Sequence, residues 1–388
     1  MVEWKKLVSV ANVLYGYPFE SSLFSEDSNY MPLIRIRDVK PAKASTYYSG
    51  EIREEYRIKK GDILVGMDGE FNLGRWDDRD GLLNQRVLKI SGKNGCSIDG
   101  YLFHYMGPVF KKIEKETAGG SVKHLSAKVI NNILIPIPSL SEQQRIVSIL
   151  DTFTSSISNL KQQIEERRKQ YEYERDLLLD LEGKEGVEMK KLGEITTTIK
   201  VGPFGSLLHK SDYIKGGIPL VNPIHMNNGY IIKDESFSVS PELAAKLCNY
   251  FLKTNDIVFA RRGEIGRCAI VTEKENNYIC GTGSLIVRFK ERINSKYMLF
   301  LFQTPLCKNY LEKSAIGGSM LNINCDIVGK MVNPIPSFQE QSRIVSILDT
   351  FEASIANLEE QLAMREKQYE YYRNQLLTFE GEEERGKT

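Results

Sequence analysis

The sequence predicts an α+β chain that is built twice, with two globules of similar framework alternating with two long helices. A stretch of about 43 residues occurs twice with a constant offset of 198 residues, and nine consecutive residues, 145–153, recur unchanged as 343–351. Each copy carries apolar residues at helical spacing. The segments before the two copies share short motifs but differ in most surface residues. The chain therefore has a pseudo-two-fold internal repeat.

Residues 1–138 are predicted to form the first globule from short strands, turns and one helix. Alternating or continuous apolar residues bounded by glycine predict strands at 31–39, 61–71 and 81–90. A helix is expected at 101–117, with a break near Gly107 and Pro108. A glycine loop at 118–126 and a short strand near 133–137 then lead to the first long helix.

Residues 139–182 are predicted to be one long helix. Ser139 followed by Glu142 is typical of a helix start, because Ser caps the first free N–H groups and Glu reaches back to the cap. Apolar residues then follow the alternating spacing of four and three residues that marks a seam packed against another helix. The predicted packing residues in the two copies are Ile146, Leu150, Phe153, Ile157, Leu160 and Ile164, and Ile344, Leu348, Phe351, Ile355, Leu358 and Leu362.

One such helix cannot bury its seam alone, but two nearly identical helices in one chain can bury their seams against each other. Arg167 and Arg365 interrupt the seam at matching places, which we expect to cost stability and to help fix the register. Dimerisation of two chains through a coiled coil is the alternative interpretation of the seam.

The second half repeats the first after a short polar linker, 183–188. Residues 189–336 form the second predicted globule, 337–380 the second long helix, and 381–388 a charged tail that we expect to be disordered. The motif at 61–70 corresponds to 255–264, yet Gly66-Met67-Asp68 stands where Ala260-Arg261-Arg262 stands. The two globules share a framework but differ in their surface residues. We therefore expect them to bind targets of the same chemical kind that differ in detail.

Composition excludes several classes of protein. The 388 residues include 41% hydrophobic and 27% charged residues, and no apolar run is long enough for a membrane span or a signal peptide. The six cysteines show no paired spacing, so we expect free thiols in the cytoplasm. The four histidines form no metal-ligand pattern, and we expect no metal site.

Charge is divided unevenly along the chain. Residues 1–138 carry 20 Lys and Arg against 17 Asp and Glu, and residues 189–336 carry 19 against 12. The first long helix carries 6 against 9, and residues 337–388 carry 6 against 11. Basic globules suit an anionic partner and acidic helices suit a protein partner.

No catalytic or cofactor motif is recognisable. The sequence has no glycine-rich nucleotide loop, no nucleophile elbow and no Cys–His pairing. We therefore expect a protein that binds and does not catalyse, with no catalytic residue and no cofactor of its own.

Basic residues that we expect to be exposed, on the outward side of a strand or beside turns and glycine loops, are the candidates for binding DNA. Lys and Arg contact phosphates, a few Arg residues read base edges, and glycine backbones can approach phosphates closely. Ordinary solvated charges and tight turns are the alternative interpretations of these residues. The candidates are Arg35, Arg37, Arg53, Arg57, Lys123, Lys200, Lys210, Lys215, Arg261, Arg262, Gly119, Gly120, Ser121, Gly317, Gly318 and Ser319.

The joints between globule and helix carry a specific resemblance. Residues 136–151 (PIPSLSEQQRIVSILD) and 334–349 (PIPSFQEQSRIVSILD), each after a globule, resemble the specificity subunits of type I restriction–modification systems. The Gly-Gly-Ser segments and the strand at 61–70 are also similar to the family pattern. The resemblance covers nearly the whole chain.

The resemblance implies two target-recognition domains, each reading one half of a split double-stranded DNA sequence. It also implies that the two helices pack as an antiparallel coiled coil, set the gap between the half-sites and dock methyltransferase subunits, two in number. Restriction subunits are further possible partners, and the methyl donor would be bound by the methyltransferase. A coiled-coil scaffold whose globules bind proteins or glycans is the alternative function, and it predicts no salt-sensitive DNA affinity.

Overall fold

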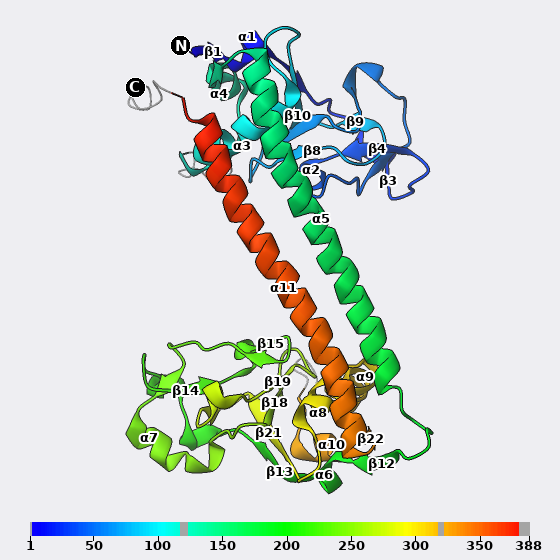
Figure 1. Ribbon diagram of the computed structural model, residues 1–388, viewed down its shortest axis with the longest axis vertical. Helices are drawn as coiled ribbons and strands as arrows, with labels where there is room; N and C mark the ends of the chain where they lie inside the picture. Colours follow the sequence, from blue (N-terminus) through cyan, green and yellow to red (C-terminus); the bar gives the residue numbers. More distant parts are fainter. Residues whose placement is uncertain (1, 117–122, 317–321, 380–388) are drawn as a thin grey trace. The chain divides into compact units, whose positions relative to one another are not determined.

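The computed structural model describes residues 2–116, 123–316 and 322–379 (Figure 1). The chain divides into two compact units, each of which contains one globule and parts of both long helices. Unit 1 comprises residues 1–162 and 360–388, and unit 2 comprises residues 163–359.

The core of unit 1 lies between an antiparallel sheet and a helix. The sheet has the strand order β2 (Ala11–Tyr15), β10 (Val87–Gly92), β7 (Ile63–Gly66) and β8 (Leu73–Arg75). Helix α3 (Asp99–Glu116) packs on this sheet, and its apolar side chains join those of the strands in one buried cluster. The apolar face of α3 thus closes the core.

A second, five-stranded sheet extends unit 1. Its strand order is β3 (Phe24–Ser25), β5 (Tyr47–Tyr48), β4 (Met31–Ile34), β9 (Gly81–Leu83) and β6 (Arg57–Ile58). Strands β4 and β9 are parallel, and the other neighbours are antiparallel. Aliphatic and aromatic side chains pack on it in two small clusters, separate from the core under α3.

Short elements complete unit 1 around the start of the first long helix. Strand β1 (Glu3–Lys6) pairs with β11 (Leu134–Ile137), which directly precedes that helix. Helices α1 (Leu7–Val10) and α4 (Ala127–Asn132) lie beside this pair, and α2 (Ile36–Val39) follows β4. The two 3₁₀ turns are η1 (Ser21–Leu23) and η2 (Glu54–Tyr56).

Unit 2 repeats the core arrangement of unit 1. Its antiparallel sheet has the order β13 (Thr196–Val201), β21 (Ser284–Phe289), β18 (Ile257–Ala260) and β19 (Cys268–Ile270). Two helices, α8 (Ser295–Phe302) and α9 (Pro305–Ser314), take the place of α3. The pair β12 (Glu188–Lys191) and β22 (Val332–Ile335) repeats β1 and β11, with α6 (Leu192–Ile195) and α10 (Cys325–Lys330) beside it.

The second sheet of unit 2 keeps only the centre of its counterpart. Strand β14 (Ile218–Val221) lies between β17 (Ser238–Val239) and β20 (Ile279–Cys280), and it is parallel to β20 as β4 is parallel to β9. The remaining elements are the hairpin β15 (Met226–Asn227) and β16 (Tyr230–Ile231), helix α7 (Pro241–Lys246), and the turns η3 (Gly205–Leu207), η4 (Lys210–Asp212), η5 (Pro223–His225), η6 (Cys248–Tyr250) and η7 (Glu273–Glu275).

The two long helices are α5 (Leu140–Leu179) and α11 (Phe338–Leu377), each of 40 residues. The Ser139 hydroxyl accepts a hydrogen bond from the Glu142 N–H at 3.3 Å, as predicted for a cap. The carboxylate of Glu142 does not complete the expected capping box. It forms two hydrogen bonds with Arg145, because a guanidinium one turn further on competes for it.

In each unit α5 and α11 run side by side and antiparallel (Figure 1). In unit 1 Phe153 stacks on Tyr372 with ring centroids 5.2 Å apart, and Lys161 pairs with Glu366 at 3.0 Å. In unit 2 the Tyr171 and Phe351 rings are 6.4 Å apart. Residue numbers rise on one helix as they fall on the other.

The two arginines of the seam stack on aromatic rings. Arg365 lies 5.7 Å from the centre of the Phe153 ring, and Arg167 lies 6.0 Å from that of Phe351. A guanidinium over a ring face gains about 0.5–1 kcal/mol at exposed sites. The expected loss of stability at these positions is therefore partly offset.

The start of each long helix is bonded to its own globule through a buried glutamine. The side chain of Gln143 is fully buried; it accepts from the Ile98 N–H at 3.1 Å and donates to the carbonyl oxygens of Cys96 and Pro138, both at 3.0 Å. In unit 2 Gln341 accepts from the Asn294 N–H at 2.9 Å and donates to a proline carbonyl. The Glu-Gln of the repeated motif is thus a structural joint.

An aspartate eight residues further on, about two helical turns, adds an ionic bond to each joint. In unit 1 Asp151 pairs with Arg75 at 3.2 Å and with His104 at 2.7 Å. Burial lowers the pKa of His104, although the hydrogen bond with Asp151 opposes this shift. In unit 2 the equivalent Asp349 pairs with Lys296 at 2.7 Å.

Three sequence predictions in unit 1 are wrong in detail. The strand expected at 31–39 ends at Ile34, because the Asp38 carboxylate accepts the Arg35 N–H and closes the short helix α2. The strand expected at 81–90 is split into β9 and β10, since Arg86 adopts a positive φ of 70° between them. Helix α3 continues through Pro108 without the expected break, because its buried face extends to Phe110.

Replacing Gln143 by Ala is expected to destabilise unit 1 by about 2 kcal/mol, because an N–H and two carbonyl groups lose their partner. The exposed neighbour Gln144 provides the matched control, and Gln144→Ala is expected to change stability by less than about 0.5 kcal/mol. Native-state hydrogen exchange at the amides of β10 measures the opening free energy of this unit. Equal protection in the two variants would contradict the role of the joint.

Candidate nucleic-acid interface

Arg35 and Arg37 lie at the two sides of the start of α2. The Arg35 guanidinium lies 5.8 Å from the centre of the Phe24 ring. Arg37 donates to the hydroxyl groups of Ser45 at 2.9 Å and Thr46 at 2.8 Å. Among residues 2–116, 123–316 and 322–379, neither guanidinium forms an ion pair, so both keep an uncompensated positive charge.

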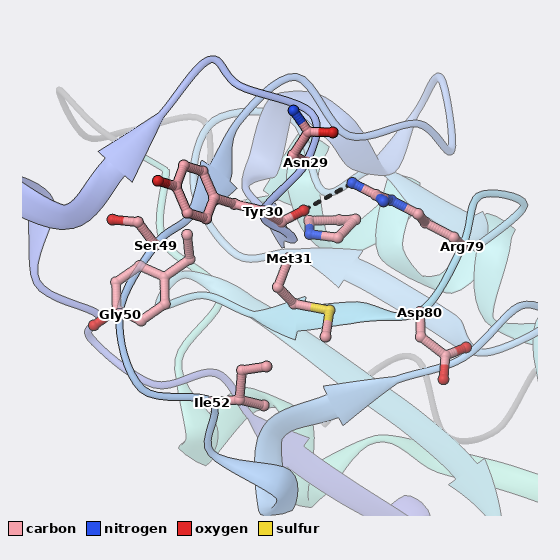
Figure 2. A pocket seen from close by; sticks show the side chains of 10 residues that line it. Asn29, Tyr30, Met31, Ser49, Gly50, Ile52, Arg79 and Asp80 are labelled. Atoms are coloured by element: carbon pink, nitrogen blue, oxygen red, sulfur yellow. Dashed lines mark hydrogen bonds between the residues drawn. The ribbon is translucent and has the colours of Figure 1, made fainter.

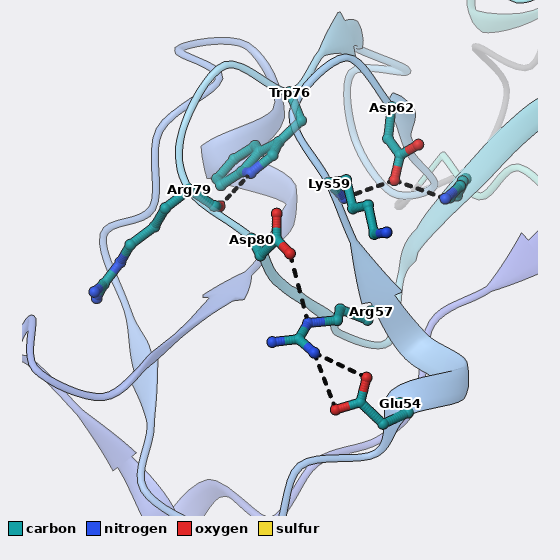
Figure 3. Close-up of polar contacts among 8 residues, drawn as sticks. Glu54, Arg57, Lys59, Asp62, Trp76, Arg79 and Asp80 are labelled. Atoms are coloured by element: carbon teal, nitrogen blue, oxygen red, sulfur yellow. Dashed lines mark hydrogen bonds and ion pairs between the residues drawn. The ribbon is translucent and has the colours of Figure 1, made fainter.

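Arg53 and Arg57, unlike Arg35 and Arg37, lie close to carboxylates. Arg53 lies 4.2 Å from the centre of the Tyr17 ring and 3.7 Å from the Glu55 carboxylate. Arg57 donates two hydrogen bonds to Glu54, at 2.9 and 3.1 Å, and lies 3.7 Å from Asp80 (Figure 3). Glu54 and Asp80 compensate the charge of Arg57, which makes it a weaker candidate for a phosphate contact than Arg37.

Arg79 belongs to this surface although sequence reasoning missed it. It donates to the carbonyl oxygen of Tyr30 at 2.7 Å (Figure 2). It also donates to the carbonyl oxygen of Ser28 and lies 5.6 Å from the centre of the Tyr47 ring. In the sequence Arg79 stands among Asp77, Asp78 and Asp80, so this segment carries a net negative charge and does not indicate a basic site. The fold separates its guanidinium from these carboxylates.

Arg79 also lines an open pocket of about 430 Å³ on the five-stranded sheet (Figure 2). The lining includes amide, hydroxyl, guanidinium and carboxylate groups, from Asn29, Tyr30, Tyr48, Ser49, Arg79 and Asp80. These groups supply both donors and acceptors, which is the chemistry needed to distinguish the edges of base pairs.

The turn after β7 carries a cluster of charged side chains in unit 1. His124 Nδ1 lies 2.5 Å from Asp68, and Arg86 lies 3.5 Å from the same carboxylate. The predicted residue Lys123 pairs with Glu114 at 3.3 Å. Sequence reasoning found Lys123 but not the cluster beside it, since its members come from three separate segments.

Unit 2 has the same backbone at this turn with different side chains. The Leu125 N–H bonds to the Met67 carbonyl in unit 1, and the Ile323 N–H bonds to the Arg261 carbonyl in unit 2. Asp68 bridges to His124 in unit 1. Arg262 bridges to Asn322 in unit 2.

The two predicted arginines of this turn in unit 2 differ in orientation. Arg261 Nε donates to the Ile323 carbonyl at 3.2 Å, and burial lowers the pKa of its guanidinium. The Arg262 side chain is exposed. Arg262 is therefore the one available to a partner, and Arg261 supports the turn from inside.

Among the described residues, no hydrogen bond, ion pair or ring contact joins the predicted lysines of unit 2 to Arg261 or Arg262. Lys200 donates to the Asn249 carbonyl at 3.3 Å and lies 4.6 Å from the centre of the Tyr250 ring. Lys210 and Lys215 are exposed, Lys210 at the start of η4. The six predicted glycine-loop residues, Gly119, Gly120, Ser121, Gly317, Gly318 and Ser319, lie outside the described residues.

In the part of the chain that the structure describes, no group of three or more His, Cys, Asp or Glu side chains is arranged to hold a metal ion. No helix among residues 2–116, 123–316 and 322–379 combines the length and apolar character of a membrane span.

Comparison with known families gives one match over most of the chain. Residues 1–167 and 184–364 match the family model described as the type I restriction modification DNA specificity domain. The chain is 29% identical to the EcoBI type I restriction enzyme specificity subunit of Escherichia coli, over 91% of this chain and 80% of that protein. It is 28% identical to a putative type I specificity subunit of Haemophilus influenzae, over 97% and 96%.

Solved structures resemble the chain in fold. The specificity subunit of a type I restriction–modification system from M. genitalium matches with a TM-score of 0.61 and 16% identity, over 98% of this chain and 96% of that one. A chain from a structure of a type I restriction–modification system matches with a TM-score of 0.59 and 17% identity, over 97% and 96%.

Proposed function

The chain belongs to the family of type I restriction–modification DNA specificity proteins, and from this premise we propose that each of its globules reads one half of a split DNA target. Residues 1–138 would be the first recognition domain and residues 189–336 the second. The chain is the non-catalytic specificity component, which explains why a recognisable catalytic or cofactor motif is absent from its sequence. We infer that it acts on DNA in the cytoplasm.

One observation carries this proposal: the two units share the turn after β7 and β18 but not its side chains. Asp68, Arg86 and His124 surround it in unit 1, whereas Arg262 and Asn322 occupy it in unit 2. Carboxylate, Arg and Asn groups prefer different base edges. The same framework would therefore present two different sets of base-contacting side chains to two different half-sites.

Phosphate contacts would come from cations that have no carboxylate partner. In unit 1 the best candidates are Arg35, Arg37 and Arg79, which surround the segment 40–48 together with the exposed Lys40 and Lys43. Phosphate contacts set the position of a protein on DNA, and base contacts then supply the sequence preference. The pocket beside Arg79 is the proposed source of further base contacts in this half.

The long helices, which we assign to residues 139–182 and 337–380, would form an antiparallel coiled coil that sets the distance between the half-sites. The stacking of Arg365 on Phe153 and of Arg167 on Phe351 supports this arrangement within each unit. The acidic helices would leave the DNA to the globules and bind methyltransferase subunits, two in number, and the assembly could also include restriction subunits. Residues 183–188 would serve as a linker.

A coiled-coil scaffold for proteins or glycans is disfavoured. The named relatives are specificity subunits of type I restriction enzymes, and the match to them extends over nearly the whole chain. A scaffold would also leave the difference between the two equivalent turns without an explanation.

Removing an unpaired cation is expected to weaken DNA binding more than removing a neutralised one. Arg37→Ala and Arg79→Ala should each lower affinity several-fold and reduce the slope of log affinity against log salt by about 0.9. Arg57 is the matched control, because Glu54 and Asp80 compensate its charge. Fluorescence anisotropy over a salt series measures both quantities, and identical slopes in all three variants would contradict the assignment.

Methylation mapping directly tests whether the side chains after β7 and after β18 each read one half of the target. Cells that express the chain with its methyltransferase should carry a split methylated motif, and cells without the chain should lack it. Asp68→Asn should relax the first half of the motif only, and Arg262→Gln the second half only. A change in both halves from either substitution would contradict separate recognition.

Lengthening both long helices should change only the number of base pairs between the two half-sites of the DNA target. Seven residues inserted between 162 and 163, and seven between 359 and 360, preserve the heptad pattern and add about 10 Å of helix. At about 3.4 Å per base pair this length corresponds to roughly three extra base pairs. The half-sites read by methylation mapping should stay unchanged, and altered half-sites would count against the spacer role.

A further inference from the structure

The turn after β14 in unit 2 has a counterpart in unit 1, the turn after β4. In unit 1 the Asp38 carboxylate accepts the Arg35 N–H at 2.9 Å, and the Asp38 N–H bonds to the Arg35 carbonyl at 2.9 Å. In unit 2 His225 Nδ1 accepts the Asn222 N–H at 3.1 Å, and the His225 N–H bonds to the Asn222 carbonyl at 2.9 Å. The two turns are therefore closed in the same way by different side chains.

The residue before each closing side chain is exposed and differs in chemistry between the units. Arg37 takes this position in unit 1, and Ile224 takes it in unit 2. The Ile224 side chain is 62% exposed, although His225 after it is buried. Burial lowers the pKa of His225, so its ring stays neutral and continues to accept the N–H that closes the turn. Ile224 is thus an apolar side chain displayed on a fixed backbone.

The Ile224 turn lies beside the turn after β18, which we assigned above to base recognition. From that turn the Arg267 guanidinium donates to the Pro223 carbonyl at 3.4 Å. The Arg261 N–H bonds to the Gly283 carbonyl at 2.9 Å, and ring atoms of Pro223 lie 3.0 and 3.1 Å from the place that a Cβ on Gly283 would take. These contacts place Ile224 at the edge of the proposed base-contacting surface of unit 2.

This surface has a different chemical character in the two units. Arg86 of unit 1 corresponds to Gly283, because its carbonyl accepts the Met67 N–H at 2.9 Å in the same way. The Arg86 side chain lies 3.5 Å from Asp68. A side chain on Gly283 would instead have to displace the ring of Pro223. Where unit 1 has a guanidinium, unit 2 therefore has a proline ring, followed in the chain by the exposed isoleucine.

A second exposed isoleucine adjoins the same turn. The Ile232 N–H bonds to the His225 carbonyl at 2.7 Å, and the Ile232 side chain is 54% exposed. Single exposed apolar residues are normal on protein surfaces and need no explanation. Here two isoleucines and a proline belong to one turn and to the segment bonded to it, so the apolar character is a property of this edge of the surface.

We propose that Ile224 is a specificity-determining residue, which reads a thymine in the second half-site by contact with its 5-methyl group. This inference rests on the proposed function, because it requires unit 2 to face DNA. The thymine methyl is the apolar feature of the major groove, and apolar side chains contact it. Isoleucine offers no hydrogen bond to the other base edges, so its contact favours the base that carries the methyl group.

The length of the side chain separates Ile224 from its counterpart. Arg37 extends away from its turn, since its guanidinium is bonded to the hydroxyl groups of Ser45 and Thr46. A phosphate contact by Arg37 is therefore made at the segment 45–46 and not at the turn. Ile224 is too short to leave its own turn, so it remains beside the residues that follow β18.

Removing single methyl groups from the DNA tests this role. Methylation mapping first gives the motif, and deoxyuridine then replaces each thymine of the motif in turn, which removes the methyl group only. Fluorescence anisotropy measures binding of each duplex to the complex of the full-length chain with its methyltransferase. One replacement in the second half-site is expected to weaken binding about four-fold, the effect of exposing about one methylene group.

Two variants link that effect to one side chain. Ile224→Ala should bind the thymine duplex and the sensitive deoxyuridine duplex equally. Leu306→Ala is the matched control, because Leu306 is also 62% exposed but lies in α9, and it should keep the four-fold difference. An Ile224→Ala variant that keeps the difference would overturn the proposal. A motif in which no thymine methyl affects binding would overturn it as well.

Methylation mapping of Ile224→Arg tests whether the position sets a base preference. This variant should lose the thymine preference at the base pair identified with deoxyuridine and leave the other half-site unchanged, because a guanidinium favours the edge of guanine. Retention of thymine at this base pair would contradict the role of Ile224.

The two proposals fail in different ways. Failure of the unmodified complex to bind any split motif would overturn the proposed function itself. Normal binding to the mapped motif without any dependence on thymine methyl groups would overturn only the role of Ile224. Loss of the four-fold difference in Ile224→Ala, with the difference kept in Leu306→Ala, supports both.

Discussion

The organisation of this protein depends on the buried glutamine at the start of each long helix. Gln143 and Gln341 satisfy backbone groups of the helix start and of the adjoining globule with one amide. A tyrosine supports each joint, since Tyr101 and Tyr297 donate to proline carbonyls at 2.7 and 2.8 Å. A buried amide group without hydrogen-bond partners lowers the stability of the fold, so the position of each glutamine side chain at the joint is closely determined. Each globule is consequently held in a defined orientation on the first turns of its helix.

A rigid joint allows the rest of each globule to vary. The sheet under α3 and its counterpart in unit 2 keep strand order and pairing, while the second sheet changes from five strands to three. The side chains after β7 and β18 differ in charge on the same backbone. In the proposed function, a constant frame with variable surfaces lets the same fold read different DNA sequences.

Sequence patterns located the long elements of the fold, and the charge count located its basic globules. The heptad spacing predicted both helices over nearly their observed lengths, because a long uninterrupted apolar stripe has few alternatives. Short strands were less predictable. The side chain of Asp38 ends one of them, and the left-handed backbone at Arg86 divides another. Both effects depend on local contacts that periodicity does not record.

The candidate site was only partly predictable. Arg37 and Arg262 were predicted from their charge and expected exposure, but charge alone could not separate them from Arg57, which two carboxylates neutralise. Arg79 was missed because its sequence neighbours are acidic. Ion pairing is decided by which side chains the fold brings within a few ångströms, and sequence distance says little about this.

The sequence by itself determined the internal repeat, the two long helices, the positive charge of the globules and the resemblance to a family. These features depend on periodicity, identity and composition, which are properties of the chain before it folds. Only the tertiary structure decided which cations remain unpaired, that the seam arginines stack on Phe153 and Phe351, and that Ile224 is exposed beside the turn after β18. These facts depend on contacts between distant segments and on solvent exposure, which exist only once the chain is folded.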